Sequence, residues 1–385
     1  LNKGVYVLND KNNFNLKFNS NGKFKIMQIS DIQDSLNVSK DTMKFINAAL
    51  DEAKPDLVIF TGDQLKGYSS AFRGSQGEKN VKTVIDAIVE PLSKRNVPFA
   101  VAFGNHDLQC KLSTEKQLEL YKNHNNFVSK CTTEVPGVSN CILPILSSDE
   151  KEIAFNIYII DSHGSKGSGY ETVSIEQIEW YRKERERLKE ENNGKYVASF
   201  MFQHIPFEEM YYAFDEFNKK TKGALRAYRK RKGKYYALKK DFVNEQSFFG
   251  ELPAVPDDNN GQFEAISEKG DIVGIFFGHD HKNCFIANYK GVDMGYCPGV
   301  GFAAYGPRFN RGIRVFELNE NQPKKYTSHM LFYKDLIGTG VEKRLKQYLI
   351  DKSPSSVDLA IYQISRLLIT LAVIVAIIIS IYYLF

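Results

Sequence analysis

The sequence lacks the motifs of zinc domains and of nucleic-acid-binding proteins. Its five cysteines include no C-x-x-C pair, which argues against a structural zinc site. It has no zinc finger, no arginine-rich helix, no RNA-binding aromatic motif and no evident internal repeat, and its net charge of +5 is only mildly basic. With 43% hydrophobic and 25% charged residues, the composition is that of a globular protein. We therefore expect a globular chain that binds no nucleic acid.

What the sequence does contain is a set of five apolar runs that each end on polar side chains. The run 271–277 leads into Gly278-His279-Asp280-His281. The other four runs end at Asp31-Ile32-Gln33, Gly62-Asp63, Gly104-Asn105-His106-Asp107 and His204. Short runs of this kind are typical of buried strands. Since sites in open α/β sheets form outside the carboxyl ends of the strands, the pattern predicts one shared crevice.

Helical periodicity between these runs indicates βα alternation. It predicts helices at 40–53, at 81–94 and from a Ser174–Gln177 capping box to about 190. In the last of these helices, Ile175, Ile178 and Leu188 are expected to face inward. After His281 the pattern changes to short strands at 285–289, 292–296, 312–318 and 326–332. This order favours two packed mixed sheets with helices outside.

The order of the motifs resembles the calcineurin-like metallophosphoesterase superfamily over roughly residues 22–333. The stretch His204-Ile205-Pro206 with the acidic Glu208-Glu209, and the Gly/Tyr-rich stretch from Gly278 to Phe316, resemble its purple-acid-phosphatase-like branch of fungi and plants. The resemblance implies an α/β fold, namely a four-layer sandwich of two mixed β-sheets flanked by helices, with a C-terminal transmembrane segment added in this chain.

The resemblance also implies a centre of two divalent or trivalent metal ions. One ion would be held by Asp31, Gln33, Asp63 and His281, and the other by Asp63, Asn105, His204 and His279, with the Asp63 carboxylate bridging them. Oxygen and nitrogen ligands without a thiolate suit manganese, iron or zinc. His106 would lie beside the scissile phosphate as general acid or transition-state donor, and a metal-bridging hydroxide would attack the phosphate. Asp107 and Asp280 are expected to orient the imidazoles.

The sequence departs from the family at two positions. Gln33 stands where most members have histidine, and we expect weaker metal binding there. Lys66 stands where true purple acid phosphatases have a ligand tyrosine, and Tyr68 is two residues out of register. We therefore expect no tyrosinate-to-iron charge-transfer absorption. Lys66 and His163 could contact substrate. A surface lysine, and a structural or solvent-facing role for His163 and its neighbour Asp161, are the simpler interpretations.

Two functions follow as hypotheses. The first is a metal-dependent phosphatase that hydrolyses phosphomonoesters, with phosphodiesters or phosphoproteins as further substrates. Its substrate would be a phosphorylated small molecule, a lipid headgroup or a phosphoprotein. The second is a catalytically weak or inactive membrane receptor or binding protein with the same fold. Its metal binding would be impaired because Gln33 replaces histidine. Retention of His106 favours the enzyme. We expect a monomer.

The C-terminal residues 367–385 are almost wholly apolar and long enough to cross a bilayer. We expect a phosphoesterase domain at 1–335, a juxtamembrane linker at 336–366 and a transmembrane or anchor segment at 367–385. A membrane-anchored protein of the secretory pathway, at the cell surface or in endolysosomes, is favoured. A signal peptide removed before Leu1 and glycosylation at Asn37-Val38-Ser39 would fit that location.

Two other topologies stay open. Cationic residues before the apolar segment favour a tail anchor with the domain in the cytosol: Lys343, Arg344, Lys346, Lys352 and Arg366. Small residues at 353–356 also permit replacement of the tail by a lipid anchor.

The cysteines and one basic segment also leave alternatives. Cys284 and Cys297 could bridge a hairpin, and Cys110 could pair with Cys131 or Cys141. Five reduced thiols are the alternative. The segment 219–240 holds eleven lysine or arginine residues and is expected to form an exposed insertion. A solvated charge run is the simpler interpretation, and contact with anionic lipid headgroups or an acidic substrate is the alternative.

Overall fold

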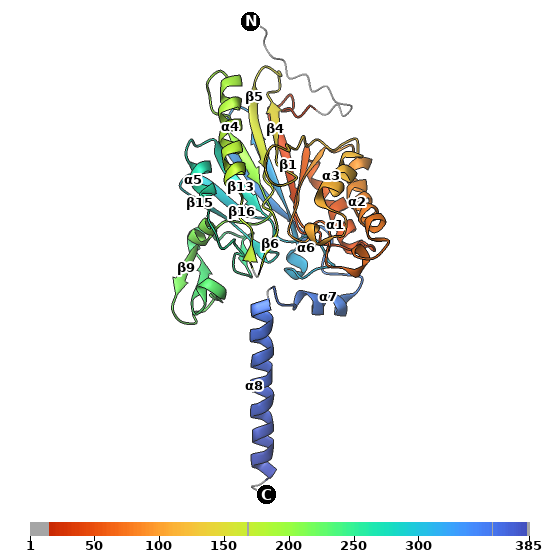
Figure 1. Cartoon of the computed structure of the whole chain (residues 1–385), viewed down its shortest axis with the longest axis vertical. Helices are drawn as coiled ribbons and strands as arrows, with labels where there is room; N and C mark the ends of the chain where they lie inside the picture. Colours follow the sequence, from red (N-terminus) through yellow and green to blue (C-terminus); the bar gives the residue numbers. More distant parts are fainter. Residues whose placement is uncertain (1–14, 168, 356, 383–385) are drawn as a thin grey trace.

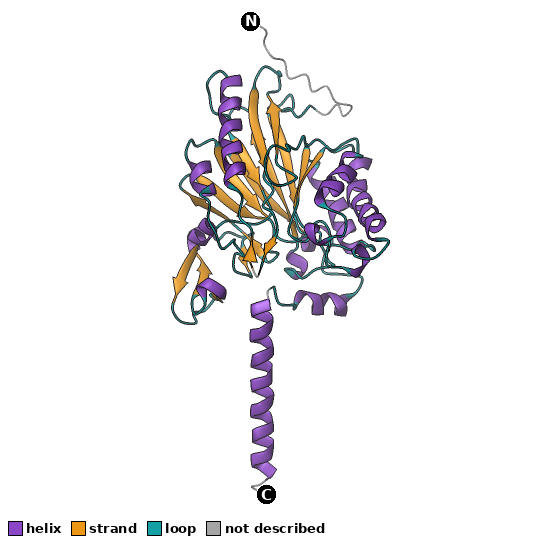
Figure 2. Ribbon diagram, in the orientation of Figure 1, coloured by secondary structure: helices purple, strands orange, loops and turns teal. Residues whose placement is uncertain are grey.

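The computed structural model describes residues 15–167, 169–355 and 357–382. Two mixed β-sheets pack face to face, and helices cover their outer faces (Figures 1 and 2). The five-stranded sheet, in the order β18-β17-β1-β2-β3, consists of β1 (Lys23–Ile29), β2 (Leu57–Thr61), β3 (Phe99–Ala102), β17 (Gly312–Asn319) and β18 (Tyr326–Phe332). The six-stranded sheet, in the order β15-β16-β13-β8-β5-β4, consists of β4 (Cys141–Leu146), β5 (Ile153–Ile159), β8 (Ser199–Phe202), β13 (Ile272–Phe277), β15 (Ile286–Tyr289) and β16 (Val292–Tyr296).

The strands in the middle of each sheet are parallel. In the first sheet β1, β2 and β3 run the same way, and in the second sheet β5, β8, β13 and β16 do. The edges are antiparallel, formed by β17 and β18 on one sheet and by β4 and β15 on the other. Since parallel strands end at the same edge, the loops after β1, β2, β3, β8 and β13 can meet.

Both faces of these strands are buried, which explains their continuous apolar runs. On β1 and β2, Ile26 and Ile59 pack between the sheets, whereas Met27 and Val58 pack against helices. The first sheet is covered by α1 (Lys40–Ala53), α2 (Gly77–Lys94) and α3 (Thr114–Lys122), and the second by α4 (Ile175–Glu191) and α5 (Gln262–Ser267). The predicted four-layer α/β sandwich is confirmed.

Local signals placed most of the predicted elements correctly. The capping box of α4 forms as expected: Gln177 N donates to Ser174 Oγ at 3.2 Å, and Ser174 N donates to Gln177 Oε1 at 2.9 Å. Ile178 and Leu188 are buried, but the prediction for Ile175 is wrong, since 61% of it is exposed. Ile175 is the first helical residue and lies about 140° around the helix from Leu188, outside the buried stripe.

The remaining elements were not predicted from the sequence. They include β4, α3, α5, α6 (Tyr333–Leu336) and α7 (Arg344–Asp351). They also include three small sheets: β6 (Ser165–Lys166) with β7 (Gly169–Tyr170), β9 (Phe214–Phe217) with β10 (Leu225–Arg226) and β11 (Tyr235–Leu238), and β12 (Phe248–Phe249) with β14 (Asn283–Cys284). Short 3₁₀ turns lie at Ser70–Phe72, Asp107–Gln109, Glu208–Ala213, Arg229–Arg231, Lys240–Phe242 and Arg308–Asn310. The basic segment therefore belongs to a three-stranded antiparallel sheet.

Three helices follow the last strand: α6 (Tyr333–Leu336), α7 (Arg344–Asp351) and α8 (Val357–Tyr382). Helix α8 extends away from the base of the domain (Figure 1). Its residues 358–382 are long and apolar enough to cross a membrane. The helix begins ten residues before the predicted apolar segment, because the polar residues of its first turns continue the same helix. The expected leader before Leu1 and the last three residues of the anchor segment lie outside the described residues.

All five cysteines are free in the structure. Cys284 and Cys297 share an apolar cluster with Met330 and Phe332, so the suggested bridge between them is not formed. Arg314 Nη2 lies 3.5 Å from Cys284 Sγ, whereas Cys297 Sγ lies 3.5 Å from the Gln28 carbonyl oxygen. The suggested partners of Cys110 are not bonded to it either. The structure therefore shows five thiols, which is one of the possibilities that the sequence left open.

Candidate functional site

The polar residues that follow five parallel strands lie close together between the two sheets. Asp31 and Gln33 follow β1, Asp63 follows β2, and Asn105 follows β3. His204 follows β8, and His279 and His281 follow β13. All seven side chains are buried, each at most 8% exposed. The structure brings five of the predicted residues together, namely Asp31, Asp63, His204, His279 and His281.

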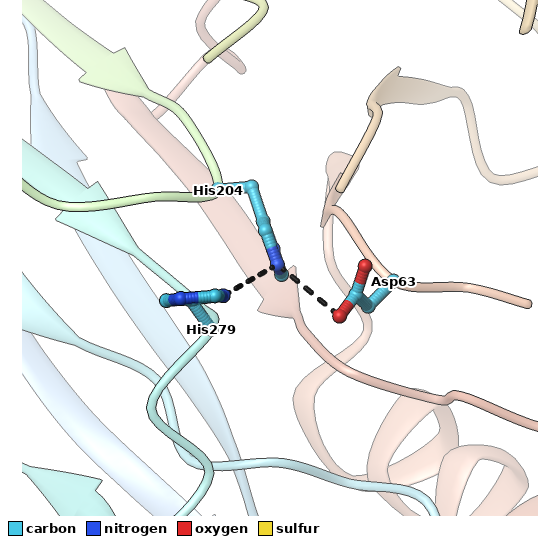
Figure 3. Close-up of side chains that lie close together, drawn as sticks. All are labelled: Asp63, His204 and His279. Carbon is cyan, nitrogen blue, oxygen red and sulfur yellow. Dashed lines mark hydrogen bonds and ion pairs between the residues drawn. The ribbon is translucent and has the colours of Figure 1, made fainter. Parts of the chain in front are cut away.

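Asp63, His204 and His279 form the first group that could hold a metal ion. His204 lies between the other two side chains (Figure 3). Its Nε2 atom is 3.3 Å from Asp63 Oδ2 and 3.2 Å from His279 Nδ1. The three donors come from strands of both sheets, so the packing of one sheet on the other fixes their separation.

Asp31, Asp63 and His281 form a second such group. Asp31 Oδ1 lies 3.2 Å from His281 Nε2. In each group the possible ligand atoms lie within 4.8 Å of one another. Asp63 belongs to both groups, which is the position that a bridging carboxylate occupies.

Two neutral amides in the loops after β1 and β3 are further candidate ligands. Among the described residues, the buried oxygens Gln33 Oε1 and Asn105 Oδ1 have no hydrogen-bond partner. A buried oxygen without a partner costs about 1–3 kcal/mol, so such atoms are rare unless a ligand satisfies them. Oxygen and imidazole donors without thiolate suit manganese, iron or zinc. The residues present therefore fit a pair of metal ions.

The backbone is strained where these ligands project. Asp31, Asp63 and His279 have φ values of 53°, 52° and 71°. This left-handed region is disfavoured for residues with a side chain, at about 1–3 kcal/mol each. Strain of this kind persists where the surrounding structure enforces it, and here it turns each side chain out of its strand direction.

Two glycines allow the strand ends to approach closely. A Cβ atom on Gly104 would lie 2.3 Å from Asp63 Oδ1. A Cβ atom on Gly278 would lie 1.9 Å from Ser30 Oγ and 2.8 Å from Asp31 Oδ2. The glycines in the Gly-Asn-His-Asp and Gly-His-x-His motifs are therefore required by the packing of one ligand loop against another.

Gly278→Ala is expected to displace Asp31 and weaken metal binding at the group of Asp31, Asp63 and His281. Overpacking at this position should also lower the free energy of unfolding by about 1–3 kcal/mol. Metal content by mass spectrometry and urea titration would measure both effects. Gly74→Ala is the matched control, because a Cβ there has no neighbour within 4 Å. Full metal content in Gly278→Ala would contradict the expectation.

Buried charges shift the pKa values of the site strongly. Burial alone would raise the pKa of Asp63, but the nearby charge of His204 outweighs it and holds that pKa well below the usual range. Burial would lower the pKa of His204, but the Asp63 carboxylate raises it to about 10. Burial and the charge of His204 push the pKa of His279 well below normal. A metal ion bound here would supply the positive charge next to Asp63 and displace a proton from His204.

Backbone carbonyls orient two of the imidazoles. His204 Nδ1 lies 2.8 Å from the Thr61 carbonyl oxygen, and His281 Nδ1 lies 2.7 Å from that of Tyr305. A carbonyl oxygen only accepts, so Nδ1 carries the proton in both rings and Nε2 faces the site. The Tyr305 ring also stacks on His281, with ring centroids 4.3 Å apart.

The two aspartates expected to orient imidazoles make other contacts. Asp107 accepts backbone N–H bonds from Leu65 and Gly104, both at 2.9 Å. Burial and the charge of Asp63 raise the pKa of Asp107 to about 8. Asp280 accepts from the Tyr296 hydroxyl at 2.6 Å and from Ala254 N at 3.2 Å. Both carboxylates fix backbone and loop positions, and the hydrogen bonds to the imidazoles come from carbonyls instead.

His106 is more accessible than the seven proposed ligands, with 27% of its side chain exposed. Its Nε2 lies 3.8 Å from Asp63 Oδ2, and its Nδ1 lies 2.9 Å from Gln109 Oε1. Its backbone N–H donates to Asp63 Oδ1 at 2.7 Å, which ties the loop after β3 to the loop after β2. The ring of Tyr68 packs edge-on against it, with centroids 5.0 Å apart.

The two candidate substrate contacts are engaged elsewhere. Lys66 Nζ donates to the Ala303 carbonyl at 2.7 Å, and burial lowers its pKa. His163 Nε2 lies 2.7 Å from Gln177 Oε1 at the start of α4. The carboxylate of Asp161 accepts from the backbone N–H groups of Val138 and His163. The contacts of His163 and Asp161 are structural, in line with the simpler interpretation, whereas Lys66 is half-buried and hydrogen-bonded rather than a free surface lysine.

Sequence reasoning missed the aromatic residues that surround the histidines. Tyr170 of β7 packs edge-on against His279, with centroids 4.5 Å apart. Tyr305 donates its hydroxyl to buried Glu251 at 3.0 Å, and Glu251 also accepts from Lys282 N. The Gly/Tyr-rich stretch after His281 was the only signal for Tyr305, and Tyr170 lies in a short hairpin that had none.

The chain is similar to several known proteins. The sequence profile of the calcineurin-like phosphoesterase family matches residues 24–283. "Probable inactive purple acid phosphatase 29" of Arabidopsis thaliana is 26% identical over 347 residues, covering 80% of each chain. Phosphatase DCR2 of Saccharomyces cerevisiae is 25% identical over 377 residues, covering 87% of this chain and 58% of that protein. A solved dimetal phosphatase from Danio rerio is 11% identical with a TM-score of 0.48, covering 80% of this chain and 99% of that one.

Proposed function

Because the chain belongs to the calcineurin-like phosphoesterase family, in its purple-acid-phosphatase-like branch, we propose that it is a metal-dependent phosphatase that hydrolyses phosphoesters. The observation that supports this most directly is the pair of overlapping donor groups that share Asp63. A structural ion-binding site would need one such group, whereas in-line phosphoryl displacement uses two neighbouring ions.

The proposed ligands follow the two groups. Asp31, Gln33, Asp63 and His281 would hold one ion, and Asp63, Asn105, His204 and His279 the other. When bound, such ions polarise the phosphoryl group and activate water as the nucleophile. Only two of the seven ligands are carboxylates, so the protein offsets part of the metal charge and leaves the site attractive to an anionic phosphate.

His106 is proposed to donate a proton to the leaving oxygen. Its Nδ1 lies 2.9 Å from the amide oxygen of Gln109, which would accept a proton held on that nitrogen. The protonated ring then presents its second proton at Nε2, on the side of Asp63. Its partial exposure leaves room for a substrate, which the fully enclosed His204 does not have.

We propose phosphomonoesters as the preferred substrates, with diesters or phosphoproteins as further possibilities. The competing function is a catalytically weak or inactive receptor with the same fold. Two observations support it: Gln33 replaces the usual histidine, and two plant relatives carry the word inactive in their names. The unpaired and buried Gln33 oxygen supports the enzyme instead, since an amide oxygen remains a competent ligand.

We further propose a monomer anchored in a membrane by α8. The exposed sequon at Asn37 supports a secretory location at the cell surface or in endolysosomes, and the cationic residues before α8 support a tail anchor facing the cytosol. The domain division at residues 335 and 366 likewise stays a prediction.

The test is hydrolysis by the purified full chain, supplied with manganese, zinc or iron, over a panel of phosphomonoesters and phosphodiesters. We expect His106→Ala to lower turnover about 10²–10⁴-fold while metal content is unchanged, because a general acid contributes that much. Asn105→Ala should instead lower metal content. Absence of hydrolysis by the metal-loaded wild-type chain across the panel would reject the enzyme and favour the receptor.

A further inference from the structure

The small sheet formed by β9, β10 and β11 lies beside the N-terminal end of α8. We call residues 214–240 the basic lobe; it is drawn in green at the lower left of Figure 1. Residues 219–240 include eleven lysines or arginines and no acidic residue. This charge is concentrated at the end of the domain from which α8 leaves (Figure 1).

The basic lobe touches α8 directly. The Arg226 guanidinium lies 4.5 Å from the centre of the Tyr362 ring, and the Tyr228 and Tyr362 rings are 6.4 Å apart. Tyr362 precedes the apolar run beginning at Leu367 by five residues, which is about 7.5 Å along a helix. The headgroup layer on each side of a bilayer is about 5–8 Å thick. If α8 spans a bilayer from Leu367 onward, the lobe lies at the level of the headgroups.

Most of this charge is not neutralised within the protein. Four residues have acidic partners: Arg229 and Lys230 pair with Asp257, Arg231 with Glu208, and Lys234 with Glu216. The other seven have no acidic partner within 4 Å among the described residues: Lys219, Lys220, Lys222, Arg226, Lys232, Lys239 and Lys240. A cluster of this size next to a membrane attracts anionic phospholipids.

Helix α7 lies on the other side of α8. It exposes its apolar face to solvent, which is unusual for a helix on the surface of a soluble domain. Gln347 and Asp351 are buried against the domain, whereas Leu345 is 73% and Leu349 61% exposed. Surface helices normally bury their apolar face. Cationic residues flank this exposed face, in the arrangement of a helix that lies in a membrane interface: Lys343, Arg344, Lys346 and Lys352.

The length of the connection keeps α7 near the bilayer. Only residues 352–356 separate α7 from α8. The six steps from Asp351 to Val357 span at most about 20 Å. Helix α7 lies across the direction of α8 at the base of the domain (Figure 1). Its apolar face can therefore reach the membrane that α8 enters.

We propose that the basic lobe and α7 form one membrane-binding surface, which binds anionic phospholipid headgroups on both sides of α8. The lobe supplies the positive charge, and Leu345 and Leu349 supply an apolar face that enters the interface. Because anionic phospholipids are concentrated in the cytoplasmic leaflet, this surface supports the orientation with the domain in the cytosol. The proposal requires α8 to span the bilayer and does not depend on catalysis.

The test uses the full chain in nanodiscs of phosphatidylcholine alone, or with about one part in four of phosphatidylserine. Lysine acylation followed by mass spectrometry measures the accessibility of each side chain. Lys219, Lys220, Lys222 and Lys232 should react at least about threefold more slowly in the mixed nanodiscs, and added salt should reverse the difference because it screens the attraction. In nanodiscs, deuterium uptake of α7 should be lower in the wild-type chain than in the variant Leu345→Lys/Leu349→Lys.

Charge-reversed variants distinguish lipid binding by the basic lobe from an effect of the net charge of the protein. Lys219→Glu/Lys220→Glu/Lys222→Glu should abolish the slower acylation of Lys232. Lys151→Glu/Lys183→Glu/Lys195→Glu makes the same charge change at the β4–β5 turn and around α4, at the opposite end of the domain (Figure 1), and should leave it unchanged. Equal acylation rates in both nanodiscs would overturn the proposal. So would protection that appears only when an acidic protein is added, because the surface would then serve a protein partner.

Discussion

Asp63→Asn is expected to remove both metal ions at once and to lower turnover by on the order of 10³-fold or more. Asp63 is the only residue in both donor groups, so loss of its charge weakens each of them. Two ions together contribute several kcal/mol of transition-state stabilisation, and each 1.4 kcal/mol is a factor of ten in rate. Metal content of the purified variant is the direct measurement, and turnover is the second.

Two matched variants make this result specific. Gln33→Ala removes a proposed ligand of one ion only, and we expect it to lower the occupancy of that ion while the other stays bound. Asp161→Asn neutralises a buried carboxylate that bonds the backbone of Val138 and His163, and it should keep both ions. If Asp63→Asn retained one full equivalent of metal, the shared carboxylate would be the wrong description of the site.

Asp351→Ala is expected to lower the free energy of unfolding by about 3–5 kcal/mol, because it leaves the Arg311 charge buried without a partner. Arg311 is fully buried, and its Nη2 lies 2.7 Å from Asp351 Oδ1. Burial lowers the pKa of Arg311 to about 10, and the Asp351 carboxylate opposes that shift. The melting temperature of the full chain in detergent should fall by on the order of 5–10 °C.

The control for this change is Glu342→Ala. Glu342 pairs with Lys40 at 3.3 Å, but both side chains are largely exposed. An exposed pair contributes about 0–1 kcal/mol, so the melting temperature should hardly move. Replacing Arg311 and Asp351 together by methionine and leucine should restore much of the lost stability, since no unpaired charge remains. A melting temperature of Asp351→Ala equal to wild type would show that Arg311 is solvated.

The sequence allowed the site to be located because local rules and tertiary structure agree there. Apolar runs without alternation predicted strands buried on both faces, and the topology brought their carboxyl ends together. The polar residue after each run was therefore enough to name Asp31, Asp63, Asn105, His204 and His279 as neighbours. The capping box at Ser174 was equally local, and it formed as predicted.

What the sequence could not provide were contacts made through the backbone and across large separations. The carbonyls of Thr61 and Tyr305 that orient imidazoles have no sequence signal, since every residue has a carbonyl. The expectation for Asp107 and Asp280 named the correct neighbourhood but assigned their hydrogen bonds to the wrong groups. Ile175 shows the limit of periodicity at a helix end, where the first turn lies beyond the packed surface.

The pairing of Arg311 with Asp351 has a mechanical consequence. Arg311 also donates to the carbonyls of Gly301 and Ala304, in the loop that leads to Tyr305 and thus to His281. One side chain therefore fastens α7 both to the domain interior and to the loop behind a proposed ligand. If α8 spans a membrane, this tie holds the end of α7 against the domain, so the five residues 352–356 set how far the proposed metal site can lie from the bilayer.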